Sequence, residues 1–530
     1  MEPQPDRLAT DRLADGGNRT NRTNRTNKWA VLALVAMSSF MTTLDGSIVN
    51  IGLPSIARSF ETPLGGTIEW IIIGYLLVIA AVLLTFGRLS DMVGRKPIWA
   101  TGLVVFTVGS GVCGAAPSLG TLIAFRAVQG LGAALLFAPG IAMITDVFGP
   151  GERGRAIGLN SVAVSLGITA GPTLGGLITE YFTWRWIFYL NVPIGVVGLV
   201  AALRLLQGTR RGGRQQFDPV GALLLALGIG SLVLGLSFGQ EWGWTSARLL
   251  AALAVGVVAL VALVIVEQRV PAPIIHLWLL RDRVFASALT SLVLNFLALF
   301  AVSFLLPFYF EELRGFSTQK SGLLLTPMSL TVAAIAPVSG SFADRIGSRW
   351  LAAGGLSLAC VGLFLMSGLD TRSSELDVVW RLVVIGCGIG MFQSPNNRAL
   401  MAAAPRSEQG EASGLLGTGR VVGQSLSVAL AGAVFASLGG AVAGAQLLAG
   451  REGQPLSAEQ IAGLQGTFVG AFHAALLVCA SLAAIGIFTA LVRGPEPGRE
   501  SRGGAGSQAE PPRQVVLPVS VPSAPGRSGK

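Results

Sequence analysis

The sequence predicts an all-α polytopic membrane protein, and three observations carry that prediction. Of its 530 residues, 52% are hydrophobic and only 12% are charged, whereas soluble domains carry about 25% charged residues. Apolar runs of roughly 18 residues or more, long enough to cross a bilayer, recur from residue 29 to residue 492. The 70 glycines suit helices that pack closely inside a membrane. These properties exclude a soluble globular domain.

We interpret each apolar run as one helix that crosses the membrane, which gives fourteen spans. Six form an N-terminal bundle (29–206), two lie in an inserted segment with cytoplasmic linkers (207–283), and six form a C-terminal bundle (284–492). Polar tails at 1–28 and 493–530 are expected to be disordered. The spans, in chain order, are 29–52, 67–87, 97–117, 120–146, 157–180, 187–206, 218–238, 247–268, 284–309, 320–342, 350–369, 378–401, 411–437 and 468–492.

The net charge of +10 follows the predicted topology and does not indicate a nucleic-acid partner. Basic residues concentrate in alternate loops, among them Arg88, Arg153 and Arg281, and in both tails. Because Lys and Arg accumulate on the cytoplasmic side of a membrane, both termini are predicted to be cytoplasmic. The expected location is the cytoplasmic (inner) membrane of a bacterium.

A basic loop pattern occurs twice on the predicted cytoplasmic face. The stretch 87–96 joins the second and third spans, and a weaker copy at 340–349 joins the tenth and eleventh. Alone, either copy fits a tight basic turn. Two copies in corresponding places form an internal repeat, which is typical of transporters.

Several stretches together resemble one family of transporters. The loop 87–96, the stretch 122–132 and the stretch 167–176 resemble the loop, fourth-span and antiporter motifs of the major facilitator superfamily. Within it, the chain is similar to the fourteen-span drug:proton antiporters of the EmrB/QacA type over residues 29–492. Those motifs lie at 44–54, 184–195 and 394–397. The resemblance implies the major facilitator fold, two six-helix bundles that rock about a midplane cavity, plus two extra central helices. Gly46 departs from the family pattern, in which Thr is common after the aspartate.

Asp45 and Arg126 are the candidate proton-coupling residues. A charge at bilayer depth costs roughly 2.5–3.5 kcal/mol and usually marks a functional site. At about 1.5 Å per residue, Asp45 lies about 24 Å beyond Trp29, and Arg126 lies about 9 Å inside the outer start of its span. Their similar depth predicts a shared aqueous cavity, in which burial and the arginine act oppositely on the charged carboxylate. A structural ion pair between helices is the alternative.

The resemblance also assigns residues to three other sites. The implied substrate cavity contains Asp45, Asn50, Tyr75, Gln129, Asn396, Asn397 and Arg420. The implied antiporter motif contains Gly167, Gly171, Pro172, Gly175 and Gly176, whose glycines favour close helix approach and whose proline favours a bend. The implied cytoplasmic gate contains Gly87, Asp91, Gly94, Arg95, Lys96, Asp344 and Arg345. Ordinary helix packing is the alternative for the glycines, and packing against carbonyl groups is the alternative for Arg420.

Two further features are expected at the outer surface. Glu69, near the outer start of the second span, is expected to be a solvated interfacial group. In the loop 438–467, the sequence from Ser457 to Gln460 matches a capping box, which predicts a short surface helix.

The expected function is export of amphipathic, often cationic, drug-like molecules in exchange for protons, by a monomer in the bilayer. No cofactor, metal or enzymatic activity is expected. ATP is disfavoured because the only Gly-Lys pair, at 529–530, is not part of a phosphate-binding loop. An exporter of one endogenous metabolite or self-made antibiotic shares every motif and stays open. A non-transporting receptor or scaffold and a channel are weaker alternatives.

Overall fold

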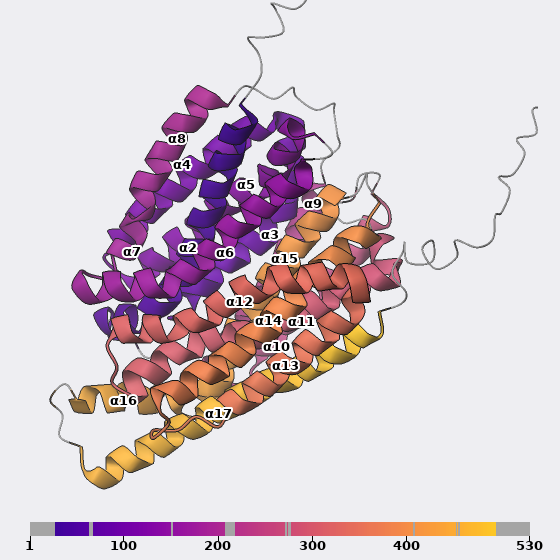
Figure 1. Cartoon of the computed structure of the whole chain (residues 1–530). Helices are drawn as coiled ribbons and strands as arrows, with labels where there is room; N and C mark the ends of the chain where they lie inside the picture. Colours follow the sequence, from indigo (N-terminus) through magenta and orange to yellow (C-terminus); the bar gives the residue numbers. More distant parts are fainter. Residues whose placement is uncertain are drawn as a thin grey trace, which may run out of the picture.

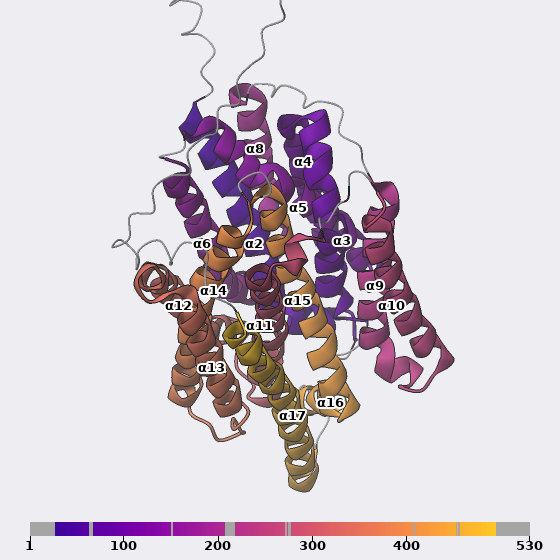
Figure 2. The same ribbon diagram turned by 90° about the vertical axis from the view of Figure 1, so that its right-hand side faces the viewer.

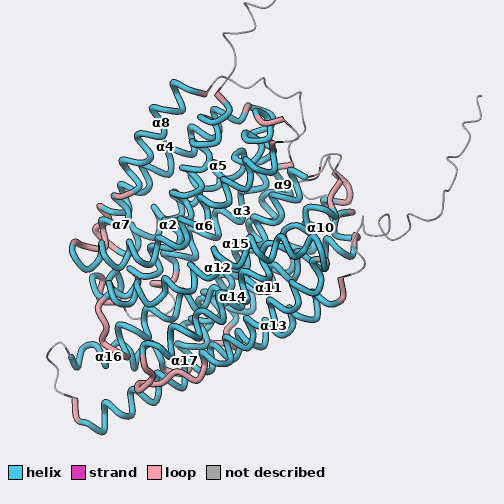
Figure 3. The backbone as a smooth tube through the Cα atoms, in the orientation of Figure 1, coloured by secondary structure: helices cyan, strands magenta, loops and turns pink. Residues whose placement is uncertain are grey.

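The computed structural model describes residues 27–62, 67–149, 152–206, 218–270, 273, 277–405, 409–451, 453 and 456–493. Every regular element within these ranges is helical (Figure 3). The all-α prediction is therefore confirmed. Of the predicted tails (1–28 and 493–530), residues 1–26 and 494–530 lie outside the described residues, as does the linker at 207–217.

The N-terminal helices form one bundle (Figure 1). Its longest member, α2, has 32 residues, which gives about 48 Å of helix, more than the roughly 30 Å of a hydrocarbon core. Large side chains such as Trp99, Phe106 and Phe188 are fully buried between the helices. The helices are α2 Lys28–Ser59, α3 Trp70–Val93, α4 Arg95–Gly114, α5 Leu119–Val147, α6 Arg153–Tyr181, α7 Trp186–Tyr189 and α8 Asn191–Leu205.

The C-terminal helices form a second bundle with its own aromatic core, which includes Phe304, Phe392 and Phe435. A short 3₁₀ turn, η1 Leu279–Arg281, precedes it, and a five-residue π-helix, η2 Tyr309–Leu313, ends its first helix. The helices are α11 Arg283–Phe308, α12 Thr318–Ile346, α13 Ser348–Met366, α14 Glu375–Ala403, α15 Gln409–Ser437, α16 Gly440–Arg451 and α17 Ala458–Leu491.

The two inserted helices, α9 Pro219–Trp242 and α10 Ala247–Glu267, lie on one flank of the molecule (Figure 2). Helix α9 packs against α3 of the first bundle and against α15 of the second. Trp70 of α3 stacks on Phe238 of α9 at 5.8 Å between ring centroids. The inserted pair therefore covers the seam between the two bundles, a position that the sequence did not indicate.

Thirteen helices of the described chain are long and apolar enough to cross a membrane. They match the predicted spans in order, with ends that differ by a few residues in most cases. Helix α14, with 29 residues, occupies the place of the twelfth predicted span but is not among the thirteen. The count of fourteen spans stays a prediction.

The predicted internal repeat has a structural counterpart. Gly94 lies between α3 and α4 with φ 113°, and Gly347 lies between α12 and α13 with φ 89°. Only glycine adopts this region readily, because it has no Cβ. Each copy of the loop pattern therefore ends one helix and begins the next at a glycine in the same region of φ.

Two predictions for the outer surface were wrong. The Ser457 capping box does not begin a short helix: it begins α17, a continuous helix of 34 residues that includes the last span. The short helix of this loop is α16, which ends before Ser457. A capping box fixes where a helix starts but not how long it runs. Glu69 is only 1% exposed, and its carboxylate lies against Gly432 of α15. We call the end of the molecule where α2 ends and α3 begins the outer end, after the predicted orientation.

Candidate functional site

Glycines of α5 bring three helices close enough to share one polar network. A Cβ on Gly130 would lie 2.5 Å from the backbone oxygen of Tyr75 on α3, and one on Gly132 would lie 2.4 Å from the backbone nitrogen of Phe106 on α4. Such approaches exclude any larger residue. They place Arg126 and Gln129 of α5 between α2, α3 and α4.

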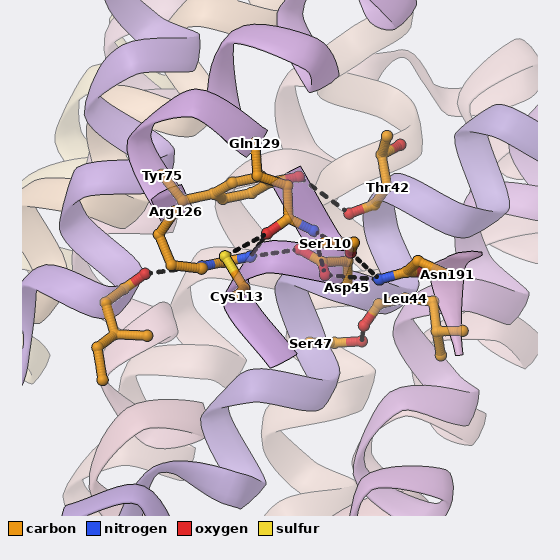
Figure 4. Close-up of polar contacts among 11 residues, drawn as sticks. Thr42, Leu44, Asp45, Ser47, Tyr75, Ser110, Cys113, Arg126, Gln129 and Asn191 are labelled. Atoms are coloured by element: carbon orange, nitrogen blue, oxygen red, sulfur yellow. Dashed lines mark hydrogen bonds and ion pairs between the residues drawn. The ribbon is translucent and has the colours of Figure 1, made fainter. Parts of the chain in front are cut away.

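Asp45 and Arg126 form a direct ion pair at the centre of this network (Figure 4). Arg126 Nη1 donates to Asp45 Oδ2 at 2.6 Å. The Asp45 side chain is 0% exposed and that of Arg126 is 1% exposed. The predicted similarity of depth is thus confirmed. The predicted shared aqueous cavity was wrong for this conformation, because the neighbouring helices close completely over the pair.

Two amides complete the hydrogen bonding of the Asp45 carboxylate. Gln129 Nε2 and Asn191 Nδ2 each donate to Asp45 Oδ1 at 2.8 Å. Both amides also donate to the Ser110 hydroxyl, at 2.7 and 3.0 Å. Buried charges are tolerated when they are paired and their remaining hydrogen-bonding positions are filled. Both oxygens of the carboxylate therefore accept from a nitrogen donor.

Arg126 has further partners that do not depend on Asp45. Its Nε donates to the backbone oxygen of Ile71 at 3.0 Å, and its Nη1 also donates to Gln129 Oε1 at 2.7 Å. The guanidinium carbon lies 4.1 Å from the ring centroid of Tyr75, a cation–π distance. Arg126 is therefore held in place by α3 and α5, while Asp45 is contributed by α2.

The antiporter motif of α6 presents two packed faces. On the first, a Cβ on Gly167 would lie 2.6 Å from the backbone oxygen of Phe40, and one on Gly171 would lie 3.1 Å from the backbone nitrogen of Ile48. Ser47 of α2 also donates to the backbone oxygen of Gly167 at 3.1 Å. Gly175 meets α2 in the same way. The predicted close approach of two backbones is confirmed, and the partner is the helix that carries Asp45.

The second face of α6 meets the other bundle. A Cβ on Gly176 would lie 2.6 Å from the backbone oxygen of Thr318, and one on Gly322 of α12 would lie 2.1 Å from the backbone oxygen of Pro172. The hydroxyl oxygens of Thr173 and Thr326 are 2.5 Å apart. All of these residues lie toward the outer end, so α6 links the helix of Asp45 to the outer contact between the bundles.

Comparison with known proteins agrees with this architecture. Residues 35–428 match the sequence profile of the Major Facilitator Superfamily. The chain belongs to this superfamily. It is therefore a multi-pass membrane protein of a family whose members transport small molecules.

Three individual proteins illustrate the range of relatives within the superfamily. The chain is 34% identical to the multidrug resistance protein Stp of Mycobacterium tuberculosis, over 77% of this chain and 76% of Stp. It is 34% identical to the riboflavin transporter RibZ of Clostridioides difficile, over 77% of this chain and 87% of RibZ. A solved bacterial homologue of the lysosomal transporter Spinster, in an inward-facing state, shares the fold with TM-score 0.63 and 17% identity. That alignment covers 88% of this chain and 96% of the homologue.

The predicted cavity residues of the superfamily fold do not all meet in this structure. Asp45, Tyr75 and Gln129 belong to the buried network, and Asn50 is buried one helical turn farther along α2. Arg420 of α15 is buried and lies within electrostatic range of Tyr75 in this network. Its Nε is buried without a hydrogen-bond partner among the described residues.

Asn396 makes its hydrogen bonds away from the buried network, and its assignment to the substrate cavity stays a prediction. Asn396 donates to the backbone oxygen of Ala288 at 3.0 Å and accepts a hydrogen bond from Arg493, which in turn donates to Ser348 at 3.1 Å. Asn396 therefore joins helices within the C-terminal bundle, at the end opposite the outer contact. Its neighbour Asn397 is half-buried.

The described gate residues make contacts inside the N-terminal bundle. Arg95 forms an ion pair with Asp146 at the end of α5, and it donates to the backbone oxygen of Ala142 at 3.1 Å. Lys96 donates to the backbone oxygen of Leu206. Gly87 lies in the last turns of α3. The side chains of Asp91, Asp344 and Arg345 lie outside the described residues.

Sequence reasoning missed two members of the site, Ser110 and Asn191. Asn191 lies within the motif at 184–195, so a polar amide at the start of an apolar helix was the available signal. Ser110 gave no such signal, because serine is common in membrane helices and only the tertiary packing points it at two amides.

Proposed function

We propose that this superfamily member is a proton-driven exporter of amphipathic, drug-like molecules. The observation that carries the proposal is the buried pair of Asp45 and Arg126, placed on two helices of one bundle. Similarity to Stp supports drug-like substrates. The proposed protein acts as a monomer in the bacterial inner membrane, with both termini in the cytoplasm. It uses protons and substrate alone, without ATP, metal or cofactor.

Proton exchange in this proposal occurs at Asp45. When α2 moves relative to α5, the carboxylate leaves its donors and takes a proton. Arg126 keeps its bonds to Ile71 and Gln129, so it does not have to move with α2. When the helices close again, Arg126 displaces the proton, because a cation beside a carboxylate favours its ionised form.

The coupling to export runs through α6. Its glycine face packs on α2 beside Asp45, and its opposite face touches α12 of the other bundle. A displacement of α2 therefore alters the outer contact between the bundles, as alternating access requires. Contiguous packing supports such coupling, and the variants described below test it.

The charge of the substrate follows from the same geometry. A cationic substrate cannot pair with Asp45 in this conformation, because Arg126 already forms an ion pair with this carboxylate. We therefore propose that cationic substrates compete with protons for Asp45 only after α2 has separated from Arg126.

Export of one specific metabolite is the second candidate function. Similarity to RibZ, which is named for riboflavin, favours it. A panel of unrelated dyes and antibiotics distinguishes the two candidates. If the protein accelerates the efflux of several of these compounds, it is a multidrug exporter. If it accelerates the efflux of none, it is a narrow exporter.

The experiment that tests the proposal uses the full chain in liposomes with an imposed pH step. Native protein and a Glu459→Gln control, altered on the exposed first turn of α17, should accumulate a dye against its gradient. Asp45→Asn should bind dye but not accumulate it. Uphill accumulation by Asp45→Asn would refute the role of this carboxylate.

A further inference from the structure

Two adjacent glutamates, Glu311 and Glu312, lie buried at the outer end of the molecule. They belong to η2, the single π-helical turn that ends α11. Glu311 is 3% exposed and Glu312 is 5% exposed. π-Helical turns are rare and often occur at functional sites. Burying two carboxylates side by side is costly unless each finds a partner, so their partners decide what this turn does.

Glu311 forms an ion pair that crosses between the two bundles. Arg58, in the last turn of α2, donates from Nη2 to Glu311 Oε2 at 3.1 Å. The Arg58 side chain is 35% exposed, whereas the Glu311 side chain is 2% exposed, so the pair reaches the outer surface from the arginine side. Arg58 is thus on the same helix as Asp45, and Glu311 is on the other bundle.

Glu312 has no comparable partner. Its Oε2 is buried without a hydrogen-bond partner in the described part of the chain, and it lies against Gly444 of α16. The nearest cation on α16, Arg451, uses its guanidinium on the backbone oxygens of Glu311 and Leu313, at 3.0 and 2.7 Å. A buried carboxylate in this position is stable when it holds a proton.

The charged groups around the pair come from three other elements. Arg58 of α2 and Arg451 of α16 favour negative charge on the glutamates, and the exposed Glu180 of α6 opposes it. Lys320 of α12 is engaged with Glu375 and does not act on the pair. Two glutamates plus Glu180 therefore face two arginines, one of which is bound to backbone oxygens.

We infer that Glu311 and Glu312 form a second proton-binding site, and that a proton taken up from the outer side breaks the Arg58–Glu311 ion pair and releases the outer contact between the bundles. Thr318, on the α12 side, lies beside Glu311, and its backbone oxygen is the group that Gly176 of α6 packs against. The ion pair and the α6–α12 contact are thus neighbours and open together. The inference rests on the proposed alternating-access function, and it adds a second acid site at the outer end.

The test measures the separation of the outer ends without substrate or a pH gradient. Spin labels at Phe182, which is 65% exposed after α6, and at Leu376, which is 73% exposed at the start of α14, report the distance between the bundles. For labelling, the four native cysteines of the full chain are first replaced by alanine. The labelled chain is studied in nanodiscs by pulsed electron resonance across a series of pH values.

The parent chain should show a short distance at high pH and a growing population with a longer distance as the pH falls. Glu311→Gln and Arg58→Gln should both give the longer distance at every pH. Glu312→Gln should keep the transition near the pH of the parent chain, because a protonated Glu312 and an amide are both neutral beside Glu311. Glu375→Gln, an exposed glutamate whose ion pair stays within the C-terminal bundle, should match the parent chain.

A distance that does not change with pH in the parent chain would overturn the inference. So would a Glu311→Gln profile that matches the parent, or a long distance in Glu311→Gln combined with a short one in Arg58→Gln. These results leave proton exchange at Asp45 untouched. Conversely, loss of proton-driven export with an intact pH-dependent distance would refute the proposed function and not the outer proton site.

Discussion

At the scale of single residues, the constant rise of a helix predicted that Asp45 and Arg126 lie at similar depth. The sequence did not predict that the pair is fully buried, because closure of the site depends on Gln129, Asn191 and Ser110 from other parts of the chain. Glu69 was misjudged for the same reason. A helix end predicts an interface with water, but Gly432 of a distant helix covers this one.

The buried ion pair makes a prediction about stability. Removing one partner leaves an uncompensated buried charge, so Arg126→Gln should lower the free energy of unfolding by about 3–5 kcal/mol. Asp45→Asn should also destabilise, and the double variant Asp45→Asn/Arg126→Gln should lose less than the sum. Chemical unfolding in detergent measures each value. Strictly additive losses would show that the two side chains do not interact.

At the scale of helices, hydrophobic runs placed most span ends within a few residues, since burial in lipid demands long apolar stretches. The capping box at Ser457 was interpreted too narrowly, as it begins a helix of 34 residues. The glycine spacing in α6 predicted a close helix contact but not its partners. Those are α2 on one face and α12 on the other.

Two glycines of α6 form a matched pair for a packing prediction. A Cβ on Gly171 meets Ser47 Oγ at 1.9 Å, whereas a Cβ on Gly158 meets nothing within 4 Å. Gly171→Ala should therefore cost about 1–3 kcal/mol through overpacking and abolish export, while Gly158→Ala should behave as the native chain. Thermal unfolding and dye efflux test both. Normal efflux in Gly171→Ala would show that transport does not depend on the close packing of α6 against α2.

The contact between α6 and α12 gives a second prediction at this scale. A methyl group on Gly322 would lie 2.1 Å from the backbone oxygen of Pro172, and neither backbone can yield without moving its helix. Gly322→Ala should hold the outer ends apart and reduce the short-distance population between labels at Phe182 and Leu376. An unchanged distance distribution would contradict the role of this contact.

At the scale of the whole molecule, the fold class was predictable from the long apolar runs, and the repeat was predictable from two copies of one loop pattern. In the structure, Gly94 and Gly347 of these copies both have positive φ. The position of α9 and α10 was not predictable, because both helices are apolar over most of their length and only tertiary packing places α9 on α3 and α15. Two acid sites now lie on opposite ends of one path. Asp45 lies inside α2, and Glu311 lies at the outer end, where it pairs with Arg58 of the same helix α2.

The most direct test of the central claim is whether substrate movement transfers protons through Asp45. Liposomes that hold the full chain and a trapped pH dye receive a substrate gradient with no initial pH difference. With native protein, protons should move across the membrane in the direction opposite to the substrate, and the trapped dye should report the resulting pH change. Asp45→Asn should move substrate down its gradient with no pH change. A pH change in Asp45→Asn equal to that of the native protein would contradict the account.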